Sequence, residues 1–444
     1  MKQFYKSLFV LVLPIAFQNL MSALVSASDA LMLGLVNQDS LSAVSLATQV
    51  QFVLSLFWAA LTIGTTILAA QYWGRGDSGS VEKVLSIALK FSFAVSFVFF
   101  AAAAVCPTLL MRIFTNDESL AALGAVYLRA VSWSYLLAGI SQIYLCIMKN
   151  SGRTLRSTVY GSVSMVLNIV LNAILIFGLL GFPKMGILGA AAATVIARGA
   201  ELLLVVLENR KKDVVRIRWS VLTESHALLR KDFVEYTAPV MANELVWGCG
   251  FTMFTVIMGH LGSDAVAANS IAGIVKNLIS CLCIGIGSGS GIIVGNELGS
   301  GNLERAKEYG SKLCKLALAA GAVSGVVLLL FVPVIVGYSG NLNPQAQTYL
   351  KGMLFMCSYY LIAKSINMTV VAGIFCAGGD TKFGLLCDTV TMWVIIVPVG
   401  LLAAFVLKLP VLAVYFLLNM DEFVKLPAVY RHYIKYQWVR NLTR

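Results

Sequence analysis

Charged residues are scarce in this chain. Asp, Glu, Lys and Arg make up only 12% of its 444 residues, whereas hydrophobic residues make up 59%. In a typical soluble protein about a quarter of the residues are charged. The shortage of charge excludes an ordinary soluble domain and predicts a protein that crosses a membrane many times.

Histidine and paired cysteine are also lacking. Only three histidines occur, far apart in the predicted topology, and most of the nine cysteines lie inside apolar runs without paired spacing. We therefore expect no metal site, no disulfide framework and no cofactor. No nucleophile lies beside a base, and no His or Asp cluster has ligand spacing, so a membrane-embedded enzyme is not expected.

What the sequence does contain is long hydrophobic runs, each sufficient to cross a hydrocarbon core roughly 30 Å thick as a helix of about 20 residues. They are continuous, unlike the alternating segments of about ten residues that form transmembrane strands. An all-α integral membrane protein with twelve transmembrane helices is therefore predicted. The first six runs cover residues 8–33, 46–72, 84–111, 122–147, 157–181 and 187–208. The second six cover residues 234–260, 267–297, 309–337, 347–375, 382–407 and 409–429.

The two halves of the chain are copies of one unit. Residues 14–76 align without a gap with residues 239–301, and special residues coincide, among them Pro14 with Pro239, Gly34 with Gly259, Gly74 with Gly299 and Gly76 with Gly301. Each copy has an even number of crossings, so the two six-helix repeats are parallel and should form two lobes with a cavity between them. The predicted parts are an N-lobe (1–208), a cytoplasmic linker (209–233), a C-lobe (234–430) and a basic cytoplasmic tail (431–444).

The net charge of +12 is unevenly placed. Most lysines and arginines fall in the termini, the linker and the loops on one side, which the positive-inside rule makes cytoplasmic. Both termini are therefore predicted to be cytoplasmic, in a multi-pass protein of the cell membrane. The charge suits this topology, so nucleic acid is not an expected partner; the bilayer is. The first apolar run resembles a signal peptide but is too long and is repeated later, so it should be retained.

Proline and glycine within the runs have structural interpretations. Pro14, Pro107, Pro239 and Pro333 remove backbone hydrogen bonds inside predicted spans and permit either a fixed bend or a moving hinge. The glycine-rich run 285–291 superficially resembles a phosphate-binding loop. It lies inside a span without a preceding strand, so close helix packing by small residues is the better interpretation.

Ionisable residues inside spans are costly, and each is a functional candidate. Asp29 lies in the first span, and its repeat mate is the apolar Phe254. Because this acid occurs in one lobe and not in the other, a site that binds and releases a cation is favoured over a structural hydrogen bond. Arg198 and Glu201 are three residues apart on one helical face and are interpreted as a self-satisfied pair. Asp421, Glu422 and Lys425 in the last span are interpreted similarly.

Glu244 lies five residues after Pro239, near mid-membrane, and its repeat mate is Asn19. Trp247 shares its helical face, and a carboxylate beside an indole suits an organic cation. Lys276 and Lys364 also lie within spans, with Lys364 at a similar depth. A pair between Glu244 and Lys364 would be either a fixed structural bridge or a switch broken by a proton, sodium ion or cationic drug. Asp388, one turn before Trp393, either joins this charge cluster or lies near the cytoplasmic mouth.

Several motifs resemble one known family. Residues 168–178 (NIVLNAILIFG) and 181–198 (GFPKMGILGAAAATVIAR) are similar to the fifth and sixth helices of the multidrug and toxic compound extrusion (MATE) family. Further similarities are DALMLG at 29–34, LSAVS at 41–45, NSGRT at 150–154 and GGDT at 378–381. The resemblance covers nearly the whole chain. It implies a twelve-helix antiporter that exports amphipathic, often cationic drugs against sodium ions or protons.

The resemblance also implies residue roles. Asp29 matches the first-helix acid implicated in cation coupling, and Asn168 matches the fifth-helix asparagine. Asn172 stands where many members have an aspartate, so part of the usual acid cluster is missing. Glu244 lies about one turn before the family's seventh-helix glutamate, where this chain has Trp247.

The sequence thus predicts a secondary active exporter, expected to be monomeric, that works by alternating access. Asp29 would take the coupling ion, sodium or a proton, with Asn168 and Asn172 lending oxygens. Glu244, Trp247, Asp388, Lys276, Lys364 and Asn19 form the predicted substrate and charge cluster. The alternative is a flippase for lipid-linked saccharides or an exporter of another metabolite. A flippase needs basic cavity walls, for which Lys276, Lys364 and Arg198 are the candidates.

Overall fold

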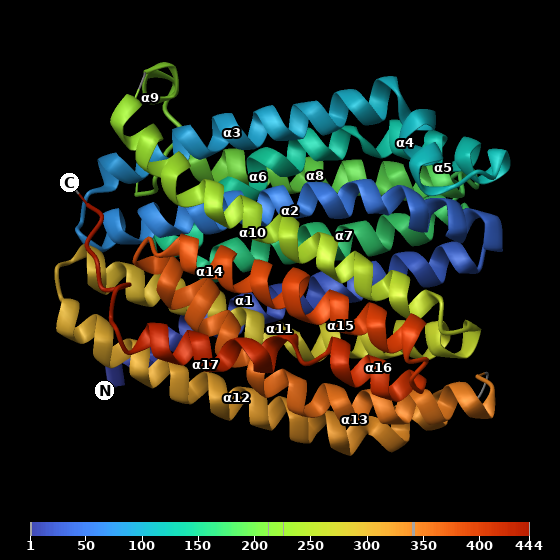
Figure 1. Cartoon of the computed structure of the whole chain (residues 1–444). Helices are drawn as coiled ribbons and strands as arrows, with labels where there is room; N and C mark the ends of the chain where they lie inside the picture. The colour runs from blue at the N-terminus through green and yellow to red at the C-terminus, as the bar shows by residue number, and fades with distance from the viewer. Residues whose placement is uncertain (1, 212, 225, 340–341, 444) are drawn as a thin grey trace. The chain divides into compact units, whose positions relative to one another are not determined.

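The structure is a computed structural model that describes residues 2–211, 213–224, 226–339 and 342–443 (Figure 1). Within these ranges the chain is almost entirely helical and forms no strand, which confirms the all-α prediction. A helix satisfies its own backbone hydrogen bonds. A segment in lipid requires this because no water is available there to replace them.

The helices follow the two repeats. Those of the first repeat and the linker are α1 (Lys2–Gly34), α2 (Gln38–Gly74), α3 (Ser78–Val105), α4 (Pro107–Phe114), α5 (Glu118–Val131), α6 (Trp133–Asn150), α7 (Thr154–Phe177), α8 (Ile187–Asn209) and α9 (Trp219–Thr223). The second repeat starts with α10 (Ala227–Gly259), α11 (Ser263–Gly299), α12 (Leu303–Tyr338) and α13 (Pro344–Asn367). It continues with the π-helical η1 (Met368–Phe375), α14 (Thr381–Thr389), η2 (Val390–Ile396), α15 (Val397–Leu401), η3 (Leu402–Val406), α16 (Val411–Leu418) and α17 (Asp421–Tyr433).

The predicted spans correspond to these helices with local differences. In the part of the chain that is described, 10 candidate spans are long and apolar enough to cross a membrane, and α5 with α6, bent by 46°, makes up to 11. The predicted third span, 84–111, ends early at Val105, because Pro107 has no N–H and begins α4 instead. The predicted last span, 409–429, is divided between α16 and α17. Each of these pieces is too short to cross alone.

The prolines do not all behave alike. Pro14, Pro239 and Pro333 lie within the continuous helices α1, α10 and α12. Pro107, the repeat mate of Pro333 in the sequence, instead occupies the first turn of α4. A proline at a first turn costs no hydrogen bond, since its missing N–H would be unpaired there anyway.

The chain forms two compact units. Unit 1 consists of Met1–Phe17, Thr66–Gly76 and Glu235–Arg444, and unit 2 consists of Gln18–Thr65 and Asp77–Val234. The predicted lobes follow the sequence repeat, whereas the units follow packing. The beginning of α1 and the end of α2 therefore belong to the same unit as the second repeat.

Unit 2 is built around apolar side chains from α1 to α8. Leu33, Leu54, Met111, Leu128 and Ile176 are almost completely buried in its core. Helix ends carry the expected signals. Asp77 accepts a hydrogen bond from the backbone N–H of Ser80 at the start of α3, and Gly178, with φ 74°, ends α7 in the left-handed conformation.

Unit 1 contains close helix crossings made by small residues. The glycine-rich run lies in α11, and a Cβ on Gly287 would come within 2.8 Å of the carbonyl oxygen of Met368. A Cβ on Gly373 would in turn come within 2.7 Å of the carbonyl oxygen of Gly287. These contacts confirm that the run serves helix packing. Lipid tails are as apolar as the helix side chains, so the hydrophobic effect contributes little to helix association in a membrane. Close van der Waals packing of this kind is one of the main forces that hold such helices together.

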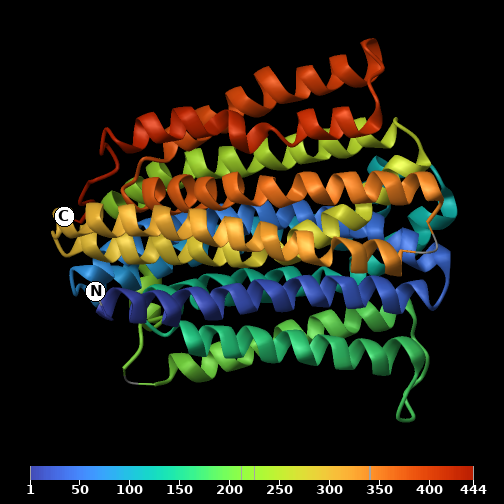
Figure 2. The same cartoon turned by 90° about the horizontal axis from the view of Figure 1, so that it is seen from below.

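The predicted basic tail packs into unit 1. Trp438 is fully buried, and its carbonyl oxygen lies against Gly378. The side chain of Gln71 donates to the carbonyl of Arg440 at 3.1 Å and accepts from the N–H of Leu442 at 2.6 Å. Figures 1 and 2 place this segment and the start of α1 at the same end of unit 1.

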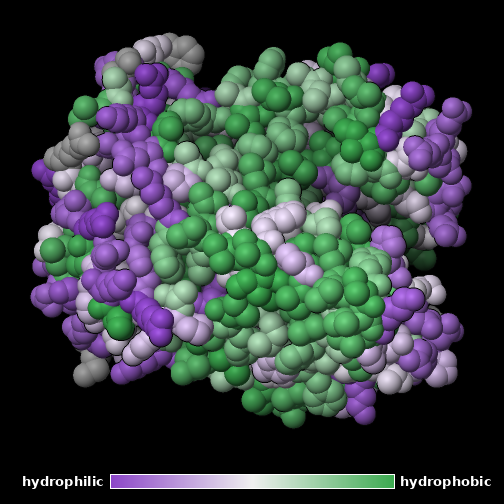
Figure 3. Space-filling view, in the orientation of Figure 1, coloured by the Kyte–Doolittle hydropathy of each residue, from purple (hydrophilic) through white to green (hydrophobic). Residues whose placement is uncertain are grey.

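The surface is apolar along the middle of the long helices. On the face seen in Figure 3, hydrophobic residues cover the middle of the helices and hydrophilic residues gather near their ends. Many large apolar side chains are exposed along single helices, for example Val159, Val163 and Val170 of α7. This distribution is that of a multi-pass membrane protein.

Candidate ion and substrate sites

Asp29 lies at one end of a chain of hydrogen bonds inside unit 2. Its Oδ1 accepts a bond of 2.6 Å from Nδ2 of Asn172, and the same amide donates to Oδ1 of Asn168 at 3.2 Å. Nδ2 of Asn168 donates to Oγ1 of Thr194 at 3.2 Å. Asp29 comes from α1, the two asparagines from α7 and Thr194 from α8. The three predicted ion-coupling residues are thus brought together.

The spacing of the asparagines explains this geometry. Asn168 and Asn172 are one turn apart, so they lie on the same face of α7. Both are buried, and the Oδ1 atom of Asn172 has no hydrogen-bond partner within the described part of the chain. Tyr127 is buried and interacts electrostatically with Asp29 and with the buried Tyr135. Nothing in their spacing identified these two tyrosines.

Several side-chain oxygens lie along this chain of hydrogen bonds. A carboxylate, an unpartnered amide oxygen and a second amide oxygen are ligands suited to a hard cation. A carboxylate alone can also accept a proton. The arrangement therefore fits either coupling ion, and both amide N–H groups of Asn172 are already engaged in holding the acid and Asn168 in place.

Glu244 of α10 lies in unit 1 without a salt bridge. Among the residues that the structure describes, no lysine or arginine lies within ion-pair distance of Glu244, so the pair with Lys364 does not form here. Glu244 is within electrostatic reach of Asp388. Its neighbour Asn243 has a buried Oδ1 atom without a hydrogen-bond partner in the same described part.

Aromatic side chains lie next to Glu244 on α10. Trp247 stacks with Phe251 at a centroid distance of 5.7 Å and an interplanar angle of 15°. Trp393 of η2 donates from Nε1 to the carbonyl of Val246 at 3.2 Å, which holds η2 against α10. One carboxylate beside several indole and phenyl faces is suited to cations that are also apolar.

The negative charge of Asp388 is balanced by Lys425, which the sequence analysis had grouped with Asp421 and Glu422. Lys425 of α17 contacts Oδ1 of Asp388 at 2.9 Å and Oε2 of Glu422 at 3.1 Å. Glu422 also accepts a bond of 2.8 Å from Nδ2 of Asn367. The expected pair of Glu422 with Lys425 is present but is part of a larger network. Asp421 differs, since its Oδ1 has no hydrogen-bond partner in the described chain.

Lys276 and Lys364 meet at one ring. Their Nζ atoms lie 4.6 Å and 5.8 Å from the centroid of the Tyr360 ring. Lys276 also donates to Oδ1 of Asn419 at 3.3 Å. Lys364 interacts electrostatically with Asp421 and Glu422 rather than with Glu244. Tyr360 stands one turn before Lys364 on α13, a spacing that could have identified it.

The remaining predicted residues are separate from these groups. Arg198 pairs with Glu201 at 2.9 Å, as expected, and Glu201 also accepts from the hydroxyl of Ser141. Asn19 lies in unit 2, whereas its repeat mate Glu244 lies in unit 1. The Nδ2 atom of Asn19 is buried without a hydrogen-bond partner in the described residues. In the same described ranges, no three His, Cys, Asp or Glu side chains gather as metal ligands.

Comparison with known proteins gives one family. The sequence model of the MatE family matches residues 14–174 and 239–402, which are the two copies of the repeat. The chain is 22% identical over 436 residues to the "Uncharacterized transporter YisQ" of Bacillus subtilis, and the alignment covers 98% of this chain and 95% of that protein. It is 28% identical over 336 residues to the "Probable multidrug resistance protein NorM" of Thermotoga maritima, covering 73% of this chain and 70% of that protein.

A solved structure shows the same fold. The "Outward-facing conformation of a multidrug resistance MATE family transporter of the MOP superfamily" is 19% identical and superimposes with a TM-score of 0.88. The match covers 97% of this chain and 95% of that chain. At this identity the likeness concerns the fold alone.

Proposed function

Because this chain belongs to the MatE family, we propose that it is a secondary active exporter that moves amphipathic, cationic compounds out of the cell against sodium ions or protons. The observation that carries the proposal is the Asp29 site. A carboxylate is held there by Asn172, whose own amide oxygen is left without a partner. Such an oxygen cluster is costly in a membrane unless it takes up a ligand.

In this mechanism Asp29 binds the coupling ion. The ion contacts the carboxylate of Asp29 and the free amide oxygen of Asn172, and Asn168 fixes the orientation of Asn172. Binding neutralises the acid and so removes a buried charge from unit 2. A conformational equilibrium then shifts only because the ion has different affinities for its two states.

The substrate site is proposed at α10 in unit 1. Glu244 has no salt bridge among the described residues, whereas Asp388 is compensated by Lys425. Glu244 is therefore the acid available to a cationic ligand, and Trp247 and Phe251 supply aromatic faces beside it. A ligand cation over an aromatic ring gains about 0.5–2 kcal/mol or more when water is excluded.

Lys276 and Lys364 are proposed to balance charge rather than to bind the cationic substrate. Both lie at Tyr360, and Lys364 interacts with the acids of α17. A flippase for lipid-linked saccharides would use such cations for a pyrophosphate group. Arg198, the third basic candidate for that function, is already paired with Glu201.

The proposed topology follows from the charge distribution. The linker and both ends of the chain are placed on the cytoplasmic side of the inner membrane, and the transporter is proposed to act as a monomer. Both chain ends lie at the same end of unit 1, which supports the proposal that they face the same side of the membrane (Figure 2).

Transport measurements test the proposal. We would load vesicles that contain the purified protein with ethidium and impose sodium and proton gradients separately. The comparison is between the unaltered protein, Asp29→Asn and Asp39→Asn. Asp39 is a matched control because it is exposed in the first turn of α2 and lies ten residues from Asp29.

The proposal expects efflux driven by one of the two gradients, lost in Asp29→Asn and retained in Asp39→Asn. Efflux retained in Asp29→Asn would remove Asp29 from the coupling step. No gradient-driven efflux of ethidium by the unaltered protein would argue against a cation exporter and favour an anionic or lipid-linked substrate.

A further inference from the structure

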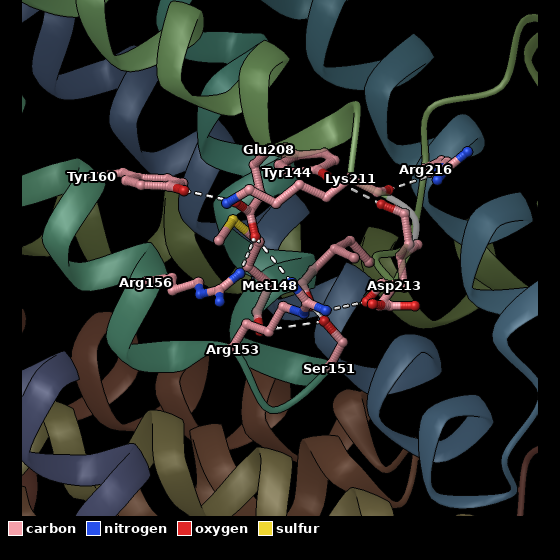
Figure 4. Close-up of polar contacts among 12 residues, drawn as sticks. Tyr144, Met148, Ser151, Arg153, Arg156, Tyr160, Glu208, Lys211, Asp213 and Arg216 are labelled. Atoms are coloured by element: carbon pink, nitrogen blue, oxygen red, sulfur yellow. Dashed lines mark hydrogen bonds and ion pairs between the residues drawn. The ribbon is translucent and has the colours of Figure 1, made fainter.

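A basic cluster in unit 2 is not used by the proposed transport cycle. Glu208, at the end of α8, is fully buried and accepts from three cations. Oε1 of Glu208 lies 3.1 Å from Nη1 of Arg153 and 3.1 Å from Nη1 of Arg156, and Lys211 contacts Oε2. Tyr160 also donates to Oε2 at 2.7 Å. Figure 4 shows these side chains converging on the one carboxylate from α7 and from the start of the linker.

Positive charge exceeds negative charge in this cluster. Arg153, Arg156 and Lys211 share the single charge of Glu208. The bond to Glu208 holds the pKa of the Lys211 ammonium above its ordinary value, so this group stays charged. An excess of positive charge at a fixed place attracts an anion.

Two of the cations have donors to spare. The side chains of Arg156 and Lys211 are 53% and 50% exposed, whereas that of Arg153 is 24% exposed. Arg153 donates both to Glu208 and to the carbonyl of Asp213. Within the described chain, Arg156 donates one of its five N–H groups to Glu208. Unused N–H groups of Arg156 and Lys211 therefore face outward.

The cluster adjoins an exposed apolar surface. On α7, Val159, Val163 and Val170 follow Arg156 on the same helical face, with exposures of 49%, 47% and 48%. On α8, Leu203 and Leu207 are 59% and 48% exposed. They precede Lys211 at intervals of four residues, about one helical turn each. The two helices pack side by side (Figure 1). A hydrophobic face that ends in two cations is complementary to an anionic phospholipid, which is apolar along its acyl chains and negatively charged at its headgroup.

We propose that Arg156 and Lys211 bind the phosphate of an anionic phospholipid whose acyl chains lie along the exposed faces of α7 and α8. The first turn of α7 contributes, since its N-terminus has no side-chain cap and its N–H groups carry partial positive charge. Glu208 holds the three cations together at this point. The lipid belongs to the leaflet that borders the linker.

The site also connects the lipid to the linker. Arg153 reaches the carbonyl of Asp213, and Nε of Arg216 donates to the carbonyl of Lys211 at 2.8 Å. Asn209 accepts from the N–H of Ile217 at 2.6 Å. A lipid phosphate on Arg156 and Lys211 would therefore stabilise the described residues 209–211 and 213–217 as well as the helix ends.

Thermal unfolding in the presence of defined lipids tests this site. The purified full chain in neutral detergent with phosphatidylcholine would be titrated with phosphatidylglycerol, and the apparent Tm recorded. The variant Arg156→Gln/Lys211→Gln removes the two charges. The control Arg305→Gln/Lys307→Gln removes two charges from exposed ion pairs of α12, at Glu297 and Glu304.

We expect phosphatidylglycerol to raise the Tm of the unaltered protein and of the control. The concentration for half the effect should rise in Arg156→Gln/Lys211→Gln by roughly 25-fold, about fivefold for each cation near a charged membrane surface. Equal lipid effects in the two double variants would overturn the proposal.

Two further arms separate the sources of phosphate. Inorganic phosphate and glycerol phosphate carry the anion without acyl chains, and they should give little shift at concentrations where phosphatidylglycerol acts. An equal shift by either would overturn the lipid assignment. Should the double variant not fold, Lys211→Gln alone is the comparison, since this exposed side chain lies beyond the end of α8, and a fivefold change is expected.

Discussion

Gly74 lies directly against the backbone of Asn296 in unit 1. A Cβ atom on Gly74 would come within 2.0 Å of the carbonyl oxygen of Asn296, and a Cβ on Gly299 would come within 1.9 Å of the carbonyl oxygen of Gln71. In the aligned repeats Gly74 is the mate of Gly299, and Gln71 is the mate of Asn296. The ends of α2 and α11 therefore cross through a reciprocal contact, as expected where two copies meet about a two-fold axis.

Gly299→Ala should destabilise this crossing. Backbone atoms stand where the new methyl group must go, so the helices have to separate, and we expect a loss of about 1–3 kcal/mol, as is typical of overpacking. The control is Gly273→Ala on the same helix, where the space around the added Cβ is open. Apparent Tm values should fall for the first variant only. Equal Tm values for both variants would show that the crossing is not tight in solution.

Asn172→Ala should weaken binding of the coupling ion. Asn172 positions both Asp29 and Asn168, and loss of a residue that orients a ligand typically costs about 10–100-fold in ion affinity. The measurement is ethidium efflux against the concentration of the coupling ion. Ser28→Ala, next to Asp29 on α1, is the control and should leave the half-saturating concentration unchanged. A half-saturating concentration in Asn172→Ala equal to that of the unaltered protein would remove Asn172 from the site.

Lys425→Gln should be strongly destabilising. The ammonium lies between Asp388 and Glu422, and its removal leaves two buried acids without their ion-pair partner. Breaking a buried pair in this way costs about 3–5 kcal/mol. The double variant Lys425→Gln/Asp388→Asn should recover part of the loss in unfolding experiments, because one of the two acids that lost this partner is gone. An additive loss in the double variant would contradict this network.

Trp438→Ala should destabilise unit 1, although it lies in the segment predicted as a tail. The indole is completely buried, stacks with Tyr433 at 5.7 Å and faces Gly310. Removing a large buried aromatic side chain costs about 3–5 kcal/mol. Lys435→Ala, at an exposed position nearby, is the control for the apparent Tm. A small change in Trp438→Ala would mean that this segment detaches readily.

The sequence predicted the helical class and the duplication because hydrophobic length and repeated glycine and proline are local signals. It did not predict the break at Ser132 or the short pieces α16 and α17. Hydropathy measures polarity and carries no information about where a continuous apolar run bends. The close contact of Gly74 with Asn296 was also hidden, although the glycine pair itself was visible in the aligned repeats.

The candidate site was predictable to a similar degree. The grouping of Asp29 with Asn168 and Asn172 came from the family resemblance, and in the structure Asn172 contacts both of the other residues. The sequence left open whether Glu244 pairs with Lys364, and this pair is not formed among the described residues. Similar depth in the membrane brings two residues to one level but leaves their rotation about the helix axes open. Rotation directs Lys364 toward Tyr360 and the acids of α17 instead.

The side chain of Gln71 binds three backbone groups, at Ala377, Arg440 and Leu442. This arrangement bears on protein engineering. A reporter domain joined directly after Thr443 begins next to an anchored segment, so it needs a flexible glycine and serine spacer to avoid pulling Leu442 from α2.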